Sequence, residues 1–317
     1  MAAMAVSMVP ASDRLPAVLP TDRLLADGRP TPEIRADLRR IPGFRNLLTV
    51  ATAWLQVALV IAVAVRIDRW WVWPLAVVLM GRSFALLAIL GHEAAHRLLF
   101  ARKQVNDWVG RWLLSYPAFV PYDLYRRSHM AHHRDEMGPD EPDKALYAGY
   151  PIARASFRRK LARDAFGSSG WKNLRPLLRA AVRPASRGVA LPILAVQGVL
   201  FLGFLAAGRP QLYLVLWLLP WMTSWRVINR LRAIAEHGGM GRAEDKRQTT
   251  HHVRQHWPAR FWMVPYHTGW HLAHHVDAGI PWRNLPRLHR ELEAAGWITP
   301  GLEWSSYPAL WRALSAG

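Results

Sequence analysis

Apolar residues in this chain are concentrated in a few long runs. Residues 47–65 and 189–208 contain no charged residue, and each run is close to the roughly 20 residues that a helix needs to cross a hydrocarbon core about 30 Å thick. Residues 70–90 and 211–228 are similar in length, and each contains one arginine. The pattern therefore predicts about four transmembrane helices, at about residues 47–66, 70–90, 189–208 and 211–228.

Tryptophan marks the ends of these runs. The chain has 17 tryptophans, and this amphipathic ring favours the interface between membrane and water. Eight of them lie at or near run ends: Trp70, Trp71, Trp73, Trp108, Trp112, Trp217, Trp221 and Trp225. A fifth apolar stretch, 108–120, is too short to span and contains Arg111 and Pro117. We expect this stretch to be re-entrant or interfacial.

Basic residues set the predicted orientation. Residues 154–187 carry ten Lys or Arg and one acidic residue, whereas the expected turns at 66–69 and Arg209 carry little charge. Segments rich in Lys and Arg stay on the cytosolic side. With four spans, residues 92–187 and 230–317 then share that side. The predicted fold class is an all-α integral membrane protein whose cytosolic helical cap lies outside the spans.

The ends of the chain are less informative. Residues 1–30 are rich in Ala, Pro and Arg and lack the apolar core of a signal peptide, so we expect them to be disordered. Residues 31–317 are predicted to form a single membrane domain. The formal net charge is +19, but the basic residues concentrate beside the predicted spans, where anionic lipid or an acidic protein is the expected partner rather than nucleic acid.

Histidines supply the candidate chemistry. Eight of the fourteen fall into three clusters: His92 and His96; His129, His132 and His133; and His271, His274 and His275. On a helix, residues i, i+3 and i+4 share one face, so each cluster directs its imidazoles together. Eight imidazoles are enough to hold two metal ions. A ligating histidine usually donates its other N–H to a carboxylate, and the candidates for that role are Glu93, Asp135 and Asp277.

Metal identity stays open at this point. The sequence His92-Glu93-Ala94-Ala95-His96 also matches the His-Glu-x-x-His signature of zinc peptidases, with Glu93 as the general base. Such an enzyme has no use for the six other clustered histidines. An all-imidazole set suits iron, copper or zinc. The absence of cysteine excludes structural disulfides, cysteine-ligated zinc and a fused iron–sulfur domain.

The three clusters resemble the histidine boxes of a known family. The order HEAAH, HMAHH and HLAHH, with two predicted spans between the second and third, is similar to that of the integral-membrane fatty acid desaturase and hydroxylase superfamily. The resemblance covers about residues 45–290. The stretches YRRSHMAHHRDEMGPDEPD and YHTGWHLAHHVDAGIPWRNLP are most similar to the branch of acyl-lipid and sphingolipid desaturases.

The resemblance implies a set of metal ligands. It assigns all eight box histidines as ligands and adds His237, which matches a further histidine placed between the second and third boxes. Two non-haem iron ions are the implied cofactors. The remaining histidines match no box, and we expect none of them to bind metal: His251, His252, His256, His267 and His289.

The implied reaction is the O2-dependent desaturation of a fatty acyl chain carried on a lipid or a thioester. Hydroxylation and carotenoid ketolation or hydroxylation use similar boxes and remain alternatives, as does the zinc peptidase. Each turnover needs two electrons. The sequence contains no haem-binding motif and no cysteine cluster, so we expect a separate donor of the ferredoxin or cytochrome b5 type. Residues 154–187 are a candidate surface for this donor or for anionic lipid.

Arg82 is an unusual charge within a predicted span. It lies ten residues before His92, which is about 15 Å along a helix at 1.5 Å per residue. A buried arginine in a span usually faces a cavity or a partner side chain. We therefore expect Arg82 either to line a substrate tunnel or to pair with another residue of the helix bundle.

Overall fold

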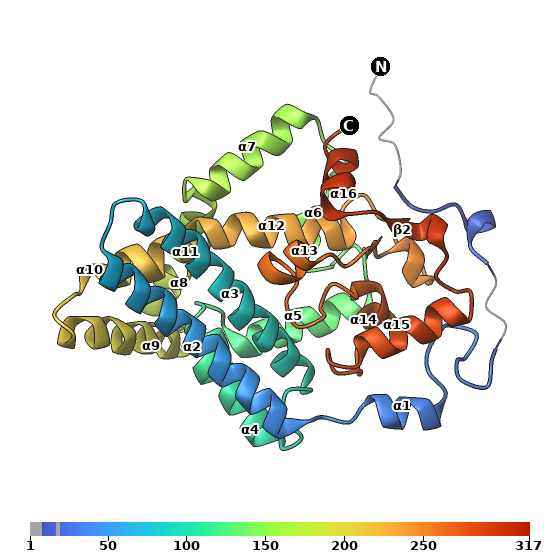
Figure 1. Cartoon of the computed structure of the whole chain (residues 1–317), viewed down its shortest axis with the longest axis horizontal. Helices are drawn as coiled ribbons and strands as arrows, with labels where there is room; N and C mark the ends of the chain where they lie inside the picture. Colours follow the sequence, from blue (N-terminus) through green and yellow to red (C-terminus); the bar gives the residue numbers. More distant parts are fainter. Residues whose placement is uncertain (1–7, 17–19) are drawn as a thin grey trace. The chain divides into compact units, whose positions relative to one another are not determined.

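The computed structural model describes residues 8–16 and 20–317, and these residues are mostly helical. They divide into two compact units. Unit 1 comprises the described residues of 1–41 together with 127–158 and 230–317, and unit 2 comprises 42–126 and 159–229. Figure 1 shows the helices of both.

Unit 2 contains three helices that are long and apolar enough to cross a membrane. They are α2 (Gly43–Ile67), α3 (Val72–His96) and α9 (Arg187–Ala206). Helices α2 and α3 pack against each other (Figure 1). Asp68 ends α2 in the left-handed conformation, with φ of 45°, and thereby starts a tight turn into α3. The helices correspond to three of the four predicted spans.

The fourth predicted span is not one regular helix. It consists of α10 (Gln211–Tyr213), the π-helical segment η3 (Leu214–Leu218) and α11 (Leu219–Met222). Thr223 then leaves helical geometry before α12 (Ser224–His237) begins. Pro220 cannot donate a backbone hydrogen bond, and its ring crowds the preceding turn, which gives a physical reason for the irregularity. The described residues therefore show three long apolar helices rather than four.

The fifth apolar stretch also contains irregular backbone. Helix α4 (Lys103–Val109) leads into the π-helical segment η2 (Gly110–Ser115), and non-helical turns follow. Exposed carbonyl groups at membrane depth need protein donors. Side chains from the neighbouring helices provide them: Trp54 Nε1 donates to Leu113 O (3.0 Å), Gln197 Nε2 to Tyr116 O (2.7 Å) and Trp221 Nε1 to Ala118 O (2.8 Å). This stretch is thus held within unit 2 by hydrogen bonds from aromatic and amide side chains.

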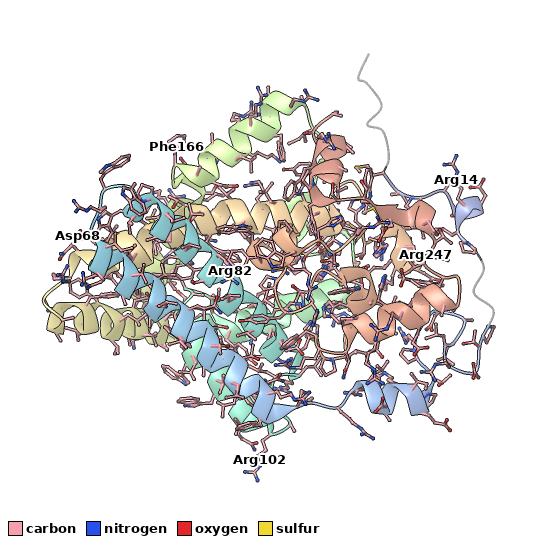
Figure 2. The ribbon with its side chains drawn as sticks, viewed as in Figure 1. Arg14, Asp68, Arg82, Arg102, Phe166 and Arg247 are labelled. Carbon is pink, nitrogen blue, oxygen red and sulfur yellow. The ribbon has the colours of Figure 1, made fainter. Side chains whose placement is uncertain are left out.

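Arg82 pairs inside the helix bundle. It lies midway along α3 (Figure 2), and its Nη1 donates to Gln56 Oε1 of α2 at 2.5 Å. Of the two roles expected for Arg82, pairing within the bundle is the one that the structure shows.

The basic segment forms α7 (Arg154–Ala165) and α8 (Ser168–Val182). Apolar side chains are exposed beside its arginines, including Phe166, Trp171 and Val182. Phe166 points away from the helices (Figure 2). Exposed aromatic and basic side chains on one segment are typical of a helix that lies in a membrane interface.

Unit 1 carries the remaining elements. They are η1 (Ser12–Arg14), α1 (Pro32–Leu38), most of α5 (Tyr122–Arg134), α6 (Lys144–Tyr147), η4 (Lys246–Gln248), β1 (His252–Val253), α13 (Trp257–Trp262), α14 (His271–Val276), α15 (Leu285–Ala294), η5 (Pro300–Leu302), β2 (Glu303–Trp304) and α16 (Tyr307–Leu314). Strands β1 and β2 pair in parallel, with His252 opposite Glu303.

The core of unit 1 forms between α14 and α15. Leu272 and Val276 of α14 pack with Leu288 of α15 and with Trp297. Leu24 belongs to the same core and is almost fully buried, although it lies in the segment 1–30 that the sequence predicts to be disordered. Residues 1–7 and 17–19 of that segment lie outside the described residues.

Candidate metal centre

Three helices position seven of the predicted ligands, and all seven residues belong to unit 1. Helix α14 buries Leu272 and Val276 in the core, so its histidines occupy the opposite face. Helix α5 carries the second box, and His237 is the last residue of α12. Six of the seven side chains are buried and one, His133, is partly buried: His129, His132, His133, His237, His271, His274 and His275.

Three of these histidines form a first group. His133 Nε2 lies 3.1 Å from His129 Nε2 and 3.1 Å from His274 Nε2. One ring nitrogen from each residue lies within 4.8 Å of the others. The second and third boxes therefore meet at one point, with their Nε2 atoms facing each other.

The other four histidines form a second group. His271 Nε2 lies 3.1 Å from His237 Nε2 and 3.0 Å from His275 Nε2. Ring nitrogens of His132, His237 and His275 also lie within 4.8 Å of one another. His237, which was assigned through a resemblance and not through a cluster, thus lies among the box histidines.

The outer ring nitrogens of the second group contact hydrogen-bond acceptors. His132 Nδ1 lies 2.5 Å from Glu141 Oε1, His275 Nδ1 lies 2.7 Å from Glu136 Oε1, and His237 Nδ1 lies 2.9 Å from the carbonyl oxygen of Thr249. A carbonyl oxygen accepts only, so the hydrogen of neutral His237 resides on Nδ1.

The inner Nε2 atoms of His237 and His275 then carry lone pairs. Burial lowers the pKa of His237 and His275 well below the usual value for histidine, which keeps both rings neutral. Nε2 lone pairs that face one another at about 3 Å repel each other unless a cation lies between them. Outer acceptors that fix the tautomer are characteristic of metal-bound histidine. The donor set therefore fits a metal ion.

The first box lies at the end of α3 in unit 2. The rings of His92 and His96 have centroids 4.7 Å apart and are tilted by 59°. Both histidines occupy the last turn of the helix, and Glu93 is buried in the same turn. The pair presents two imidazoles from one helix end, as the i, i+4 spacing predicts.

Two of the three predicted carboxylates, Asp135 and Asp277, are paired with arginines. Asp135 accepts from Arg242 at 2.8 Å, and Asp277 accepts from Arg35 at 2.5 and 3.0 Å. Three other glutamates lie beside histidines of the second and third boxes. Glu136 and Glu141 contact His275 and His132, and Glu236 Oε1 lies 3.6 Å from His271 Nδ1.

The sequence contains only a weak signal for the role of these glutamates. Glu136 lies four residues after His132, and Glu236 directly precedes His237, so proximity to a ligand was the available signal. After Arg134 the chain turns back toward α5, and Met137 in this turn has φ of 60°. The turn brings Glu141 to His132. Burial raises the pKa of Glu141, but hydrogen bonds from His132, Tyr147 and the Met137 amide outweigh it and lower the pKa overall. Glu141 is therefore held as a carboxylate.

Glu136→Ala is expected to lower the affinity for a bound metal ion by about 10- to 100-fold, because it removes the acceptor that orients His275. Asp135→Ala is the matched control, since Asp135 is the adjacent acid and pairs only with exposed Arg242 among the contacts of the described residues. Bound metal per chain is measured on both variants. Equal losses in the two variants would contradict the assignment of Glu136.

A cavity of about 740 Å³ in unit 1 reaches the histidines. His133 and His275 line it together with Asp277 and several basic side chains. The basic residues are Arg29, Arg35, Arg39 and Lys246. Lys246 Nζ donates to Glu136 at 2.8 Å, and the same carboxylate contacts His275 Nδ1. A basic side chain of the cavity is therefore linked to His275 by hydrogen bonds through Glu136.

The histidines outside the boxes contact other groups. His251 Nε2 bonds to Gly238 O at 2.7 Å, and His256 Nε2 bonds to Ser305 O at 2.8 Å. His252 and His289 stack against each other with ring centroids 4.8 Å apart, and His267 lies beside Trp270. Within the described part of the chain, none of these five belongs to either box group.

Comparison with known proteins places these motifs in a family. The family model described as "Fatty acid desaturase" matches residues 68–296. The dihydrorhizobitoxine desaturase of Bradyrhizobium elkanii is 26% identical over 254 residues, covering 74% of this chain and 72% of its own length. The sn-1 oleoyl-lipid 12-desaturase of Arthrospira platensis is 23% identical over 267 residues, with coverages of 76% and 71%.

A third relative matches over a shorter region. The sn-1 acyl-lipid omega-3 desaturase (ferredoxin) of Nostoc sp. is 30% identical over 104 residues, which are 33% of this chain and 28% of the relative. The match to the family model contains all three boxes and His237, and it extends over more than half of the chain. The chain belongs to the fatty acid desaturase family.

Proposed function

We propose that the two histidine groups hold two non-haem iron ions. The observation that carries this proposal is the set of converging Nε2 atoms whose outer nitrogens contact acceptors. His132, His237, His271 and His275 would hold one ion, and His129, His133 and His274 would belong to the other. The resemblance to the family adds His92 and His96 of α3 to the proposed ligand set.

The chain's residues have a restricted task in this chemistry. The bound irons would supply O2 reduction and the removal of hydrogen from an unactivated methylene. Glu136, Glu141 and the Thr249 carbonyl hold the imidazoles in the ligating tautomer. No side-chain nucleophile is required. The protein fixes the ligands, keeps the site largely buried and positions an acyl chain beside it.

We also propose how the chain sits in the membrane. Residues 211–228 make a fourth crossing as an irregular helix, with Leu216 and Trp217 of the π-helical segment η3 buried. The irregular backbone is tolerated where protein surrounds it. The histidine boxes then lie on the cytosolic face, and residues 31–317 act as one functional domain. Exposed Phe166 and Trp171 anchor the basic segment at the interface.

The proposed substrate is a fatty acyl chain carried by a lipid or a thioester. The names of two relatives support desaturation as the reaction, one acting on dihydrorhizobitoxine and the other on an oleoyl lipid. The test is mass spectrometry of lipids and fatty acids from a host that expresses this chain, compared with a host that expresses the His132→Ala variant. The expected product lacks two hydrogens. A product that gains one oxygen instead would show hydroxylation.

Glu93→Gln separates this function from a zinc peptidase. A peptidase needs Glu93 as its general base, whereas a carboxylate beside a metal ligand can be replaced by an amide that still accepts a hydrogen bond. We therefore expect Glu93→Gln to retain bound iron and measurable desaturation. Metal content and product are measured together. Complete inactivity at normal metal content would favour the hydrolytic reaction.

The electron donor is proposed to be a separate acidic redox protein. The cavity beside His133 and His275 is lined by Arg29, Arg35 and Arg39, and the name of the Nostoc relative specifies ferredoxin. Complementary charge speeds the association of such partners and is screened by salt. Arg39→Glu is expected to lower donor-dependent turnover by about tenfold at low salt. Turnover with a chemical reductant should not change, and an equal loss with both reductants would exclude a docking role.

A further inference from the structure

A second cluster of possible ligands lies outside the two histidine groups. His252 comes from β1, and His289 and Glu293 lie one turn apart on α15. One ring nitrogen of each histidine and one carboxylate oxygen of Glu293 lie within 4.8 Å of one another. All three residues belong to unit 1. Neither histidine belongs to a histidine box, so the sequence pattern predicts no metal at either one.

Two buried nitrogens in this cluster, His252 Nε2 and His289 Nδ1, make no hydrogen bond with any residue that the structure describes. Only 6% of His252 and 7% of His289 is exposed. Burial lowers the pKa of His252 to about 4, so its ring is neutral and its nitrogens offer one lone pair and one N–H. Buried polar atoms without a partner are rare in folded proteins and call for an explanation such as a bound ion.

Two carboxylates supply negative charge beside the rings. Glu293 Oε1 lies 3.2 Å from His289 Nε2, and Glu303 Oε1 lies 3.6 Å from His252 Nε2. Glu303 is also paired with Arg254 at 2.6 Å, which offsets part of its charge. Glu293 is half exposed at 48%, so an ion can reach the cluster from solvent. Two neutral imidazoles with carboxylates form a donor set that suits zinc.

We propose that His252, His289 and Glu293 bind a single Zn²⁺ ion at a site separate from the two iron positions. Tetrahedral zinc with bonds of about 2.0 Å brings ligand atoms to about 3.3 Å from one another. The half-exposed Glu293 side chain can make most of that adjustment. The ion would tie β1 to α15, which packs on the apolar face of α14. This zinc stabilises the fold around the third box and takes no part in the reaction.

The test measures zinc uptake by the iron-loaded full-length protein. Zinc and iron per chain are determined after zinc titration and removal of loosely bound metal. The variants are Glu293→Gln, at a half-exposed position that should not disturb folding, and His252→Ala. His256→Ala is the matched control, because that histidine is nearby in sequence but outside the cluster.

Wild type and His256→Ala are expected to take up one zinc per chain with iron unchanged. Glu293→Gln and His252→Ala should bind that zinc at least about tenfold more weakly. The His132→Ala variant should keep the zinc while losing iron, so this site and the iron site can fail independently. Absence of zinc uptake by the wild type, or equal uptake by wild type and Glu293→Gln, would overturn the proposal.

Discussion

Replacing His132 or His274 with alanine is expected to abolish product formation while the protein still inserts into the membrane. Each histidine contributes to a different group, His132 with His237 and His275, and His274 with His129 and His133. Loss of a ligand should cost more than the roughly 100-fold that follows the loss of an outer carboxylate. Neither residue lies in α2, α3 or α9, so the spans are unaffected.

Desaturated lipid in the expressing host and the membrane-bound amount of each variant are the two measurements. The matched control is His256→Ala, which removes the same imidazole from a position outside both groups. It should retain product and iron. Wild-type turnover in His132→Ala or His274→Ala would remove that residue from the ligand set.

His237→Ala is expected to lower iron content and activity as severely as a box mutation. Its Nε2 lies 3.1 Å from His271 Nε2, and its Nδ1 donates a hydrogen bond to the carbonyl oxygen of Thr249. The side chain is fully enclosed and close to the ring of His275, with centroids 4.7 Å apart. Removal of this imidazole would leave a cavity among the remaining ligands and lower the coordination number of one ion.

The choice of control matters for His237. His251 is buried, and its Nε2 bonds to the carbonyl of Gly238, the residue after His237. His251→Ala is therefore expected to reduce stability without removing a ligand, whereas His256→Ala should be close to wild type. Iron per folded chain separates the two effects. If iron stays bound in His237→Ala and is lost in His251→Ala, the ligand has been misassigned.

The histidine clusters could be predicted because helical spacing is local. In α14, the three histidines lie on one face and Leu272 and Val276 lie on the other. The spacing in the sequence is therefore enough to distinguish the ligand face of this helix from its core face. The convergence of His237 with the boxes could not be read from spacing. It depends on where α12 ends, and the resemblance to a family supplied that information.

The partners of the carboxylates near the second and third boxes could not be predicted, because several of these partners come from distant segments. Asp277 follows the third box closely, yet Arg35 pairs with it from 242 residues away. Asp135 is turned toward Arg242 just after α5 ends. Glu141 reaches His132 only because the chain reverses between them. Sequence proximity indicates which acids are near a ligand but not which way each one points.

The fourth span illustrates a different limit of the pattern. Hydropathy identifies residues 211–228 as apolar, but Pro220 and the break at Thr223 divide the run into short helical pieces. A hydropathy pattern reports the environment of a segment and not the regularity of its backbone. The interruption at 108–120 was visible because Pro117 and Arg111 are strong local signals.

Metal analysis of the purified protein is the most direct test of the central claim. Iron and zinc are quantified per chain for the wild type and for His132→Ala and His274→Ala. About two irons per wild-type chain are predicted, with fewer in each variant. One zinc and no iron in the wild type, with that zinc lost when His92 or His96 is replaced, would contradict a di-iron desaturase and support a hydrolytic centre at the first box.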